Sequence, residues 1–423
     1  MVVKKFVYSA LILFAVIFLS HKPATYTQYT HNTKNNSVFR LGVENITENF
    51  IKKFAGLNIG LITNQTGKDF RGRRSVDILL KKGLNIKKLF TPEHGMSGMI
   101  HTDKKITSCI DKKTRIQIVT LYSQGRTIKI QASMVKDIDM LLYDIQDAGM
   151  RHYTYITTLF EAMQSAAKCN KLFIVLDRPN LLGPLMDGPL VEPQYKSAIS
   201  IAPIAMRHGM TVGELALYFN RNVLSKPVKL YIVKMSNYRR DSYANNRLTT
   251  FLSSGIRNLN SCYCYSFLGV LGEIRPFNIG LGTKRRFQCI MLNEKLKFSK
   301  NNWSSLQKIF QSFGVKSSLC KKIGTKNNFT GLALNVKDMY KLQSFNLLVS
   351  IISFFKQAGL NMKFSKMFDL AVGTGKVREF FEGKRDKKAL KHFVDMNLNI
   401  FYKKASRCFL YKPSPKASVL KIS

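Results

Sequence analysis

The sequence predicts an α/β fold, in which a doubly wound parallel sheet is followed by a second, smaller α+β domain. Short apolar runs alternate with helical patterns up to about residue 236, and this rhythm is typical of βαβ units. The run at residues 172–176 is almost entirely apolar, as strands covered on both faces of a parallel sheet are. A length of 423 residues also favours two domains over one.

The first 45 residues stand apart from this pattern. Lys4 and Lys5 precede an apolar stretch at residues 6–19, which is typical of a secretory signal. The stretch is short for a spanning helix, which needs roughly 20 residues, and this favours a signal peptide. A clear small-residue cleavage pattern is missing, however, so an uncleaved inner-membrane anchor is an alternative. We expect residues 1–20 to be a signal peptide or membrane anchor and residues 21–45 a linker. The protein is then exported, and periplasmic or extracellular.

Residues 46–236 are expected to form the first domain. A helix over 154–170 carries its apolar residues on one stripe, the pattern of a helix that packs on a sheet. Another helix follows Thr211, because Glu214 stands at the spacing of a capping box. Short apolar runs predict strands at 57–63, 86–90, 116–121, 140–145, 172–176 and 228–235, and helical spacing predicts a helix at 75–82.

Residues 237–423 show a less regular pattern. We interpret them as an α+β domain that packs against the first, with a cleft between the two. A basic, glycine-rich loop is expected at 269–286. Helices are predicted at 303–313, 340–357, 376–382 and 387–404, and a strand at 331–336.

The net charge of +42 and the isoelectric point near 10.1 suit an acidic partner. Nucleic acid is the first candidate for so basic a protein. The lysines are spread along the whole chain without a recognised nucleic-acid motif, however, so no specific nucleic-acid partner is expected. An anionic membrane surface could attract this positive charge without any sequence motif. The seven cysteines form no Cys-x-x-Cys pair and are interpreted mostly as small apolar residues.

Four polar clusters follow apolar runs or loops of the first domain. They begin at Thr91, Asp144, Asp177 and Arg207 and combine acids, arginines or histidines with glycine or proline. Ligands of doubly wound sheets bind beyond the carboxyl ends of the strands, so we expect the clusters to share one site. Glu93 is the strongest candidate for its acid, because it follows a proline immediately after a buried strand.

Cofactor and metal sites have weaker support. No Gly-x-Gly-x-x-Gly follows the first strand, which argues against a dinucleotide. The segment from Gly373 to Lys376 resembles a P-loop but lacks the Ser or Thr that would hold magnesium. A metal site could be assembled from His94, His101, Asp103, His152 and His208, although nothing fixes their spacing. No cofactor and no resident metal are therefore expected.

Structural roles are the competing interpretation for the acidic residues. Asp144 or Asp147 could be buried in a hydrogen-bond network with Arg151. Asp177 could form a local ion pair with the arginine that follows it. For Glu93, the competing role of capping the backbone at the turn has less support.

The ordered motifs closely resemble those of the exo-β-N-acetylmuramidase family of the NamZ type. The resemblance covers nearly everything from residue 45 to the end, which makes it far more specific than one short pattern. It rests on Gly60-Leu-Ile-Thr-Asn-Gln-Thr-Gly67, Pro92-Glu-His-Gly95, Asp144-Ile-Gln-Asp147 with Arg151 and Tyr153-Thr-Tyr155, Asp177-Arg-Pro-Asn180, Arg207-His-Gly-Met-Thr211, Phe368-Asp-Leu370, Val377-Arg378 and Arg407-Cys-Phe-Leu-Tyr411.

The resemblance implies a Rossmann-like domain with a smaller second domain. It also implies an exported glycosidase that removes N-acetylmuramic acid from the non-reducing end of peptidoglycan fragments. The glutamate of Pro-Glu-His-Gly, here Glu93, is the implied proton donor. A general acid must hold its proton at the working pH, which burial or a neighbouring acid favours. Asp144 or Asp147 could be that neighbour, and could also position water or steady the oxocarbenium ion.

The other members of the expected site bind the sugar. The lactyl group of muramic acid carries a carboxylate, which the fork of an arginine suits; Arg151, Arg178 and Arg207 are the candidates. Tyr153 and Tyr155 could line the apolar face of the sugar. The expected substrate contacts are completed by His94, Asp177, Asn180, His208, Glu273 and Asn278.

The sequence departs from the family pattern at two places. The residues Met96-Ser97-Gly98 replace the usual arginine after Pro-Glu-His-Gly, and the later Glu-Gly-Thr-Asn…Gly-Arg-Gly-Thr segment is shortened to residues 273–283. These changes concern the expected substrate loop more than the acid. Two other functions stay open at this point: a catalytically idle cell-wall binder on the same scaffold, and a metal-dependent hydrolase that uses His94 and His208.

Overall fold

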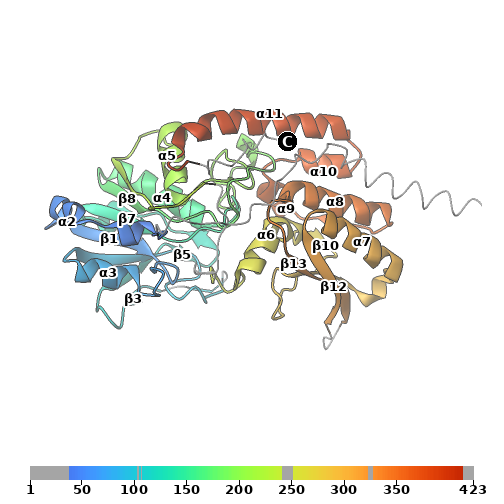
Figure 1. The fold of residues 1–423 in the computed structure, drawn as a ribbon, viewed down its shortest axis with the longest axis horizontal. Coiled ribbons are helices and arrows are strands. Elements are labelled where there is room, and N and C mark those ends of the chain that lie inside the picture. The colour runs from blue at the N-terminus through green and yellow to red at the C-terminus, as the bar shows by residue number, and fades with distance from the viewer. Residues whose placement is uncertain (1–37, 102–103, 106, 241–250, 323–326, 413–423) are drawn as a thin grey trace, which may run out of the picture.

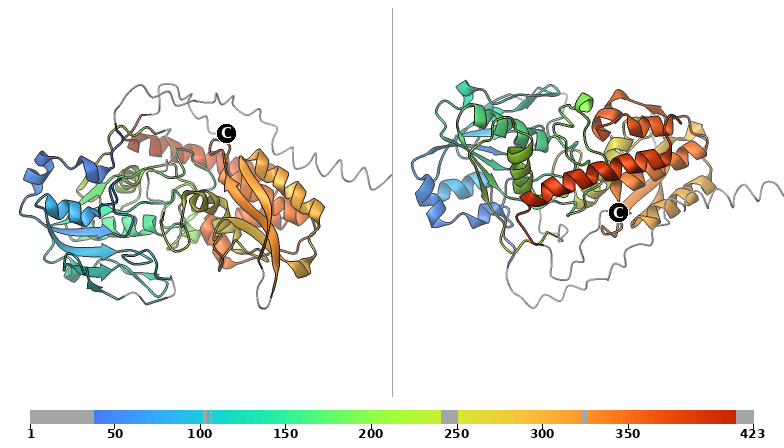
Figure 2. Two further views of the ribbon diagram at one scale, coloured as in Figure 1. Left: turned by 60° about the horizontal axis from the view of Figure 1, so that its bottom comes forward. Right: turned by 90° about the horizontal axis from the view of Figure 1, so that it is seen from above.

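The protein consists of two domains that lie side by side. The computed structural model describes residues 38–101, 104–105, 107–240, 251–322 and 327–412. In Figure 1 the first domain runs from blue to green and the second from yellow to red. The C-terminal helix α11 (Lys387–Ala405) lies along both domains, as Figure 2 shows from two further sides.

A seven-stranded sheet forms the centre of the first domain. Its spatial order is β3-β4-β2-β1-β7-β8-β9, and all neighbouring strands are parallel except β3 and β4. This confirms the predicted fold class. The strands are β1 (Asn58–Thr63), β2 (Asn85–Thr91), β3 (Cys109–Ile110), β4 (Gln117–Thr120), β7 (Met140–Asp144), β8 (Leu172–Leu176) and β9 (Leu230–Val233).

Helices pack against this sheet, with α4 and α5 on β8 and α3 on β2. The hydroxyl of Thr211 accepts from the N–H of Glu214, and the Glu214 carboxylate accepts from the N–H of Thr211, so the predicted capping box is present. The helices are α2 (Glu48–Phe54), α3 (Ser75–Lys81), α4 (Tyr155–Lys168) and α5 (Val212–Asn222). Shorter elements are β5 (Tyr122–Ser123), β6 (Arg126–Thr127) and the 3₁₀ turns Gly42–Asn45, Ala132–Met134 and Pro193–Tyr195.

The second domain combines helices with a small antiparallel sheet, which agrees with the expected α+β architecture. Strands β11 (Cys289–Asn293), β12 (Val315–Lys322) and β13 (Phe329–Val336) pair in the order β11-β13-β12, and β10 (Ile274–Arg275) pairs with β14 (Lys363–Phe364). The helices are α6 (Leu259–Leu271), α7 (Lys300–Ser312), α8 (Ser344–Gln357), α9 (Lys366–Val372), α10 (Lys376–Phe381) and α11, with 3₁₀ turns at Glu294–Leu296 and Ser406–Cys408.

Helix α6 was not predicted, and its last turn falls inside the expected loop at 269–286. Most of its residues are buried, so it lacks the polar stripe by which a surface helix is recognised. The Asn258 side chain caps it by accepting from the N–H of Ser261. Strand β12 was missed for the opposite reason, because it lies at the edge of its sheet and carries many exposed side chains.

Both ends of the described chain pack on the first domain. Residues 38–45, which the sequence placed in the linker, belong to this domain in the structure, since Leu41 and Val43 are buried. At the other end, the hydroxyl of Tyr411 donates to Asp177. The first domain therefore begins before residue 46, and the C-terminal segment returns to it.

The membrane anchor expected at residues 6–19 lies outside the described residues. Most of the expected linker, residues 21–37, lies outside them as well. In the part of the chain that the structure describes, no helix is both long and apolar enough to cross a membrane.

Candidate active site

The chain changes its direction of travel across the sheet between β1 and β7. From β1 it moves to β2 on one side, and from β7 it moves to β8 and β9 on the other. Doubly wound sheets bind ligands at such a switch point, beyond the carboxyl ends of the strands. The structure brings the polar segments after β1, β2, β7 and β8 to this edge.

Glu93 lies two residues beyond the end of β2, in a turn with an uncommon backbone conformation. His94 has a φ of 69° and Gly95 a φ of 68°, and non-glycine residues such as His94 rarely adopt this left-handed region. Glu93 is only 5% exposed. Since carboxylates are seldom buried to this extent without partners, the surroundings of this side chain indicate its role.

Hydroxyl groups and a histidine surround the Glu93 carboxylate. Thr154, at the start of α4, donates a hydrogen bond to Oε2, and the Nε2 atom of His94 lies 4.0 Å from Oε1. Burial raises the pKa of Tyr122, and the charge of Glu93 beside it raises that pKa further. His94 is held in turn by the carbonyl of Ile100, 2.8 Å from its Nδ1 atom. Glu93 is thus fixed in position and shielded from bulk water.

Three tyrosines form a wall beside Glu93. The ring centroids of Tyr153 and Tyr155 are 4.7 Å apart, and Tyr265 of α6 lies 5.9 Å from Tyr153. Burial raises the pKa of Tyr265, and the charges of Glu93 and Asp147 raise it further, so this ring lies near both acids. Because Tyr265 comes from the second domain, both domains build the site.

Several buried polar groups gather around these tyrosines. Asn64, Gln65 and Tyr153 lie beside the hydroxyl of Tyr155, and Ser253 lies beside the hydroxyl of Tyr153. Oδ1 of Asp147 is buried and has no hydrogen-bond partner among the described residues. Because nearly all buried polar groups in proteins are hydrogen-bonded, this carboxylate oxygen and the polar groups beside the tyrosines indicate a place for a polar ligand.

Asp147 keeps one carboxylate oxygen available. Its Oδ2 atom accepts from the N–H of Gly149 at 2.6 Å and lies 3.2 Å from Nε2 of His208. The Nδ1 atom of His208 accepts from the N–H of Met210, so the ring proton is on Nε2 and is donated to Asp147. His208 therefore orients Asp147, while Oδ1 meets no partner in the described chain.

Asp144 has both carboxylate oxygens occupied. Arg178 donates to Oδ1 at 2.5 Å and to Oδ2 at 2.9 Å, and Ser75 also donates to Oδ2. Neither side chain of the ion pair is more than 2% exposed. This bidentate pair joins the ends of β7 and β8. The geometry does not support the predicted catalytic role of Asp144 or the predicted substrate contact of Arg178, and Arg178 pairs with Asp144 rather than with Asp177.

Asp177 anchors the start of α5 and the C-terminal segment. Its carboxylate accepts from the N–H of Gly213 and from the hydroxyls of Thr211 and Tyr411. Burial raises its pKa to about 7. The side chain is completely buried and its oxygens are occupied, so the geometry gives it a structural role instead of the predicted substrate contact.

Other predicted substrate contacts belong to turns or to the second domain. Asn180 and Asn278 each accept a hydrogen bond from the backbone N–H two residues further on, which is the geometry of an Asx turn. Glu273 accepts from the hydroxyl of Ser365 at 2.8 Å. The charge of Glu273 contributes to the raised pKa of Tyr265, so Glu273 lies near the tyrosine wall.

Arg151 and Arg207 are completely buried and bind backbone carbonyl groups. Burial lowers the pKa of Arg151 to about 9. Its guanidinium donates to the carbonyls of Pro189, Ile204, Ala371 and Val372 and to the hydroxyl of Ser200, and Arg207 donates to the carbonyls of Leu182 and Leu342. Both arginines fasten the domains together. Neither can turn toward a substrate carboxylate without breaking these bonds, so the predicted role is not supported.

The histidines do not gather around one point. Among the described residues, no three His, Cys, Asp or Glu side chains lie close enough to hold a metal ion, and Asp103 is outside those residues. His152 packs on Tyr265 with 4.9 Å between ring centroids, and burial lowers its pKa to about 3. His94 and His208 have the separate partners described above.

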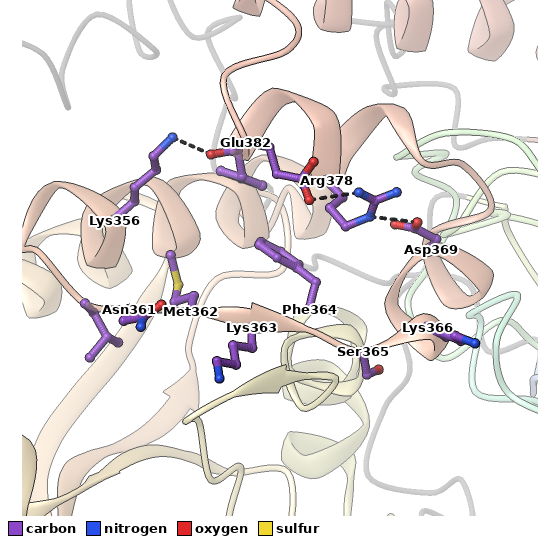
Figure 3. Close-up of a pocket in the computed structure, with 12 residues that line it drawn as sticks. Lys356, Asn361, Met362, Lys363, Phe364, Ser365, Lys366, Asp369, Arg378 and Glu382 are labelled. Atoms are coloured by element: carbon purple, nitrogen blue, oxygen red, sulfur yellow. Dashed lines mark hydrogen bonds and ion pairs between the residues drawn. The ribbon is translucent and has the colours of Figure 1, made fainter.

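A cavity of about 620 Å³ lies in the second domain, between α8, β14, α9 and α10 (Figure 3). Arg378 pairs there with Asp369 at 2.9 Å and with Glu382 at 2.8 Å, and Lys356 donates to the carbonyl of Phe381. None of the predicted site residues lines this cavity, and several of its charged groups are paired with one another. We therefore do not place the active site there.

Five residues that the structure brings to the site were not predicted: Asn64, Gln65, Tyr122, Thr154 and Tyr265. Asn64, Gln65 and Thr154 stand inside family motifs of the sequence, so these motifs could have indicated them. Tyr122 and Tyr265 lie in segments without a recognised motif. They come near Glu93 only in the folded protein, and no local sequence pattern predicts that proximity.

Comparisons with known proteins agree with this architecture. The model of the NamZ exo-β-N-acetylmuramidase N-terminal domain matches residues 59–258, and the model of the C-terminal domain matches residues 263–411. The peptidoglycan β-N-acetylmuramidase NamZ of Bacillus subtilis (strain 168) is 30% identical over an alignment of 392 residues, and the match covers 90% of this chain and 93% of that protein.

Two crystal structures of DUF1343 family proteins from Bacteroides fragilis share the fold. The first is 31% identical, with a TM-score of 0.77, and the match covers 88% of this chain and 99% of that chain. The second is 25% identical, with a TM-score of 0.70 and coverage of 89% and 100%. The similarity therefore extends over both domains.

Proposed function

Because the chain belongs to the NamZ exo-β-N-acetylmuramidase family, we propose that it is an exo-acting glycoside hydrolase that releases N-acetylmuramic acid from the non-reducing end of peptidoglycan fragments. The observation that carries this proposal is the buried acid Glu93 at the switch point, beside a tyrosine wall and the unsatisfied carboxylate oxygen of Asp147. A sugar ring has apolar faces and a rim of polar groups, and these surroundings complement both.

Glu93 is proposed as the general acid. It donates its proton to the glycosidic oxygen while the bond from that oxygen to the anomeric carbon breaks, and water adds to the anomeric carbon. Without this proton the leaving sugar would depart as an alkoxide, which explains why general acid help contributes about 10²–10⁴-fold. The hydrogen bond from Thr154 orients the carboxyl group.

Asp147 is proposed as the second acid of the site. Its Oδ1 atom could accept a proton from the attacking water or steady the positive charge that develops at the anomeric carbon. His208 and the N–H of Gly149 hold the other oxygen. His208 is thus a positioning residue in this mechanism, and it does not act on the substrate itself.

We expect Asp147→Asn to lower kcat about 10²-fold or more, because an amide neither accepts a proton nor carries the negative charge. His208→Gln should lower kcat less, since the carboxylate remains, and should shift the pH profile. Steady-state rates across pH measure both effects, with the exposed His392→Gln as the matched control. An Asp147→Asn variant with the full rate of the wild type would remove Asp147 from the mechanism.

Release of free N-acetylmuramic acid from defined glycans tests the function itself. We expect the purified protein to split the disaccharide of N-acetylmuramic acid and N-acetylglucosamine, and to remove only terminal muramic acid from longer glycans, as mass spectrometry of the early products can show. Release of internal fragments would contradict exo action. Tight binding of the glycans without turnover at any pH would favour the cell-wall binder.

We include export in the proposal, because the cell wall lies outside the cytoplasm. The charged and apolar N-terminal stretch supports it. Cell fractionation is the test, and recovery of the protein in the cytoplasm alone would contradict export. Sedimentation with anionic liposomes at varied salt would show whether the strongly basic chain also binds membranes.

A further inference from the structure

The proposed substrate carries one anionic group on its terminal sugar, the lactyl carboxylate. The three arginines that were predicted to bind this carboxylate have other partners in the structure. Arg178 binds Asp144, and Arg151 and Arg207 bind carbonyl groups. On the basis of the proposed function, we propose that Arg286 is the residue that recognises this carboxylate. Arg286 lies outside the family motifs of the sequence and was not predicted to bind substrate.

Arg286 is attached to a loop that touches the active site. The carbonyl of Leu252 in this loop accepts from the hydroxyl of Tyr155 at 3.0 Å and from Nε2 of Gln65 at 2.6 Å. Two residues further on, the carbonyl of Ser254 accepts from Nη1 of Arg286 at 3.0 Å. The guanidinium is therefore tied, through one short loop, to the tyrosine wall beside Glu93.

Phe287, the residue after Arg286, also places Arg286 near the active site. Phe287 has a φ of 52°, a left-handed conformation that bulky residues rarely adopt and that concentrates at functional sites. In this conformation its ring lies 5.0 Å from the ring of Tyr265, edge to face. Tyr265 in turn lies near both proposed acids. The strained turn thus holds the arginine at the rim of the site.

The charge of Arg286 is not neutralised by the described part of the protein. The side chain is half-buried, and its described hydrogen bond is to a neutral carbonyl. The exposed Arg257 donates to the same carbonyl at 3.1 Å, so two positive groups share one acceptor. Their mutual repulsion favours an anion nearby, and the nitrogens of Arg286 that do not bind Ser254 can donate to both oxygens of a carboxylate.

Two substrates that differ only in the lactyl group test this role. One is a chromogenic β-N-acetylmuramide with the free carboxylate, and the other is its neutral lactyl amide. We expect Arg286→Gln to lower kcat/KM on the free acid about 10–100-fold, the worth of a charged hydrogen-bond pair, chiefly through KM. The rate on the amide should stay within about twofold, and Arg286→Lys should restore part of the preference for the acid.

The matched control is Arg285→Gln, which removes the same charge from the exposed neighbouring position and should leave the preference for the acid unchanged. If wild type turns over neither substrate, the proposed function fails. If wild type is active but Arg286→Gln loses equally on both substrates, or on neither, Arg286 does not recognise the carboxylate. Should the glutamine variant fold poorly, an Arg286→Lys variant with an unchanged KM for the acid and an unchanged preference over the amide would likewise overturn the proposal.

Discussion

Replacement of Glu93 by glutamine is expected to lower kcat on a muramic acid disaccharide about 10²–10⁴-fold, the usual contribution of a general acid. Glutamine has the same shape and can still accept the hydrogen bond from Thr154, but it has no acidic proton to give to the leaving sugar. KM should change little, since the tyrosine wall and the polar rim remain. Initial rates with the purified variant measure the effect.

The matched control for this variant is Glu48→Gln, an exposed acid in the first turn of α2. It should retain the rate of the wild type. Thermal unfolding followed by circular dichroism should give similar midpoints for both variants, because neither change creates a cavity or buries a new charge. A Glu93→Gln variant with wild-type kcat would exclude Glu93 as the acid.

Replacement of Arg178 by glutamine is expected to lower the free energy of unfolding by about 3–5 kcal/mol, the usual effect of removing one partner of a buried ion pair. Asp144 would be left with its charge in a site from which water is excluded, and Ser75 would be its remaining side-chain partner. Urea unfolding of the variant and the wild type gives this difference directly. The exposed Arg71→Gln should stay within about 0.5 kcal/mol of the wild type.

The companion variant Asp144→Asn distinguishes a structural role from a catalytic one. If Asp144 serves only the ion pair, this variant loses stability and keeps most of its kcat at a temperature where it is folded. A variant that is as stable as the wild type but has a large loss of kcat would show that Asp144 takes part in catalysis.

Regular patterns in the sequence predicted the first domain well. The apolar run of β8 and the stripe of α4 report burial locally, because each element packs one or both faces against its neighbours. The capping box at Thr211 and Glu214 is local as well. For the same reason the position of Glu93 at the end of β2 could be predicted, since it needs only the strand and the parallel topology.

The roles of the arginines could not be predicted in this way. An arginine that binds a ligand and one that binds buried carbonyls look alike in a sequence, because the partners lie far apart along the chain. Arg151 binds Ala371 and Val372, which belong to the other domain. Arg286 was overlooked because its attachment to Ser254 exists only in the folded protein.

The dependence of the Glu93→Gln defect on the leaving group tests the central claim most directly. A dinitrophenolate leaves without a proton, whereas the sugar of the natural disaccharide requires one. If Glu93 is the proton donor, kcat/KM of the variant should fall about 10²–10⁴-fold on the disaccharide and far less on the dinitrophenyl muramide. An equal loss on both substrates would contradict a proton transfer from Glu93.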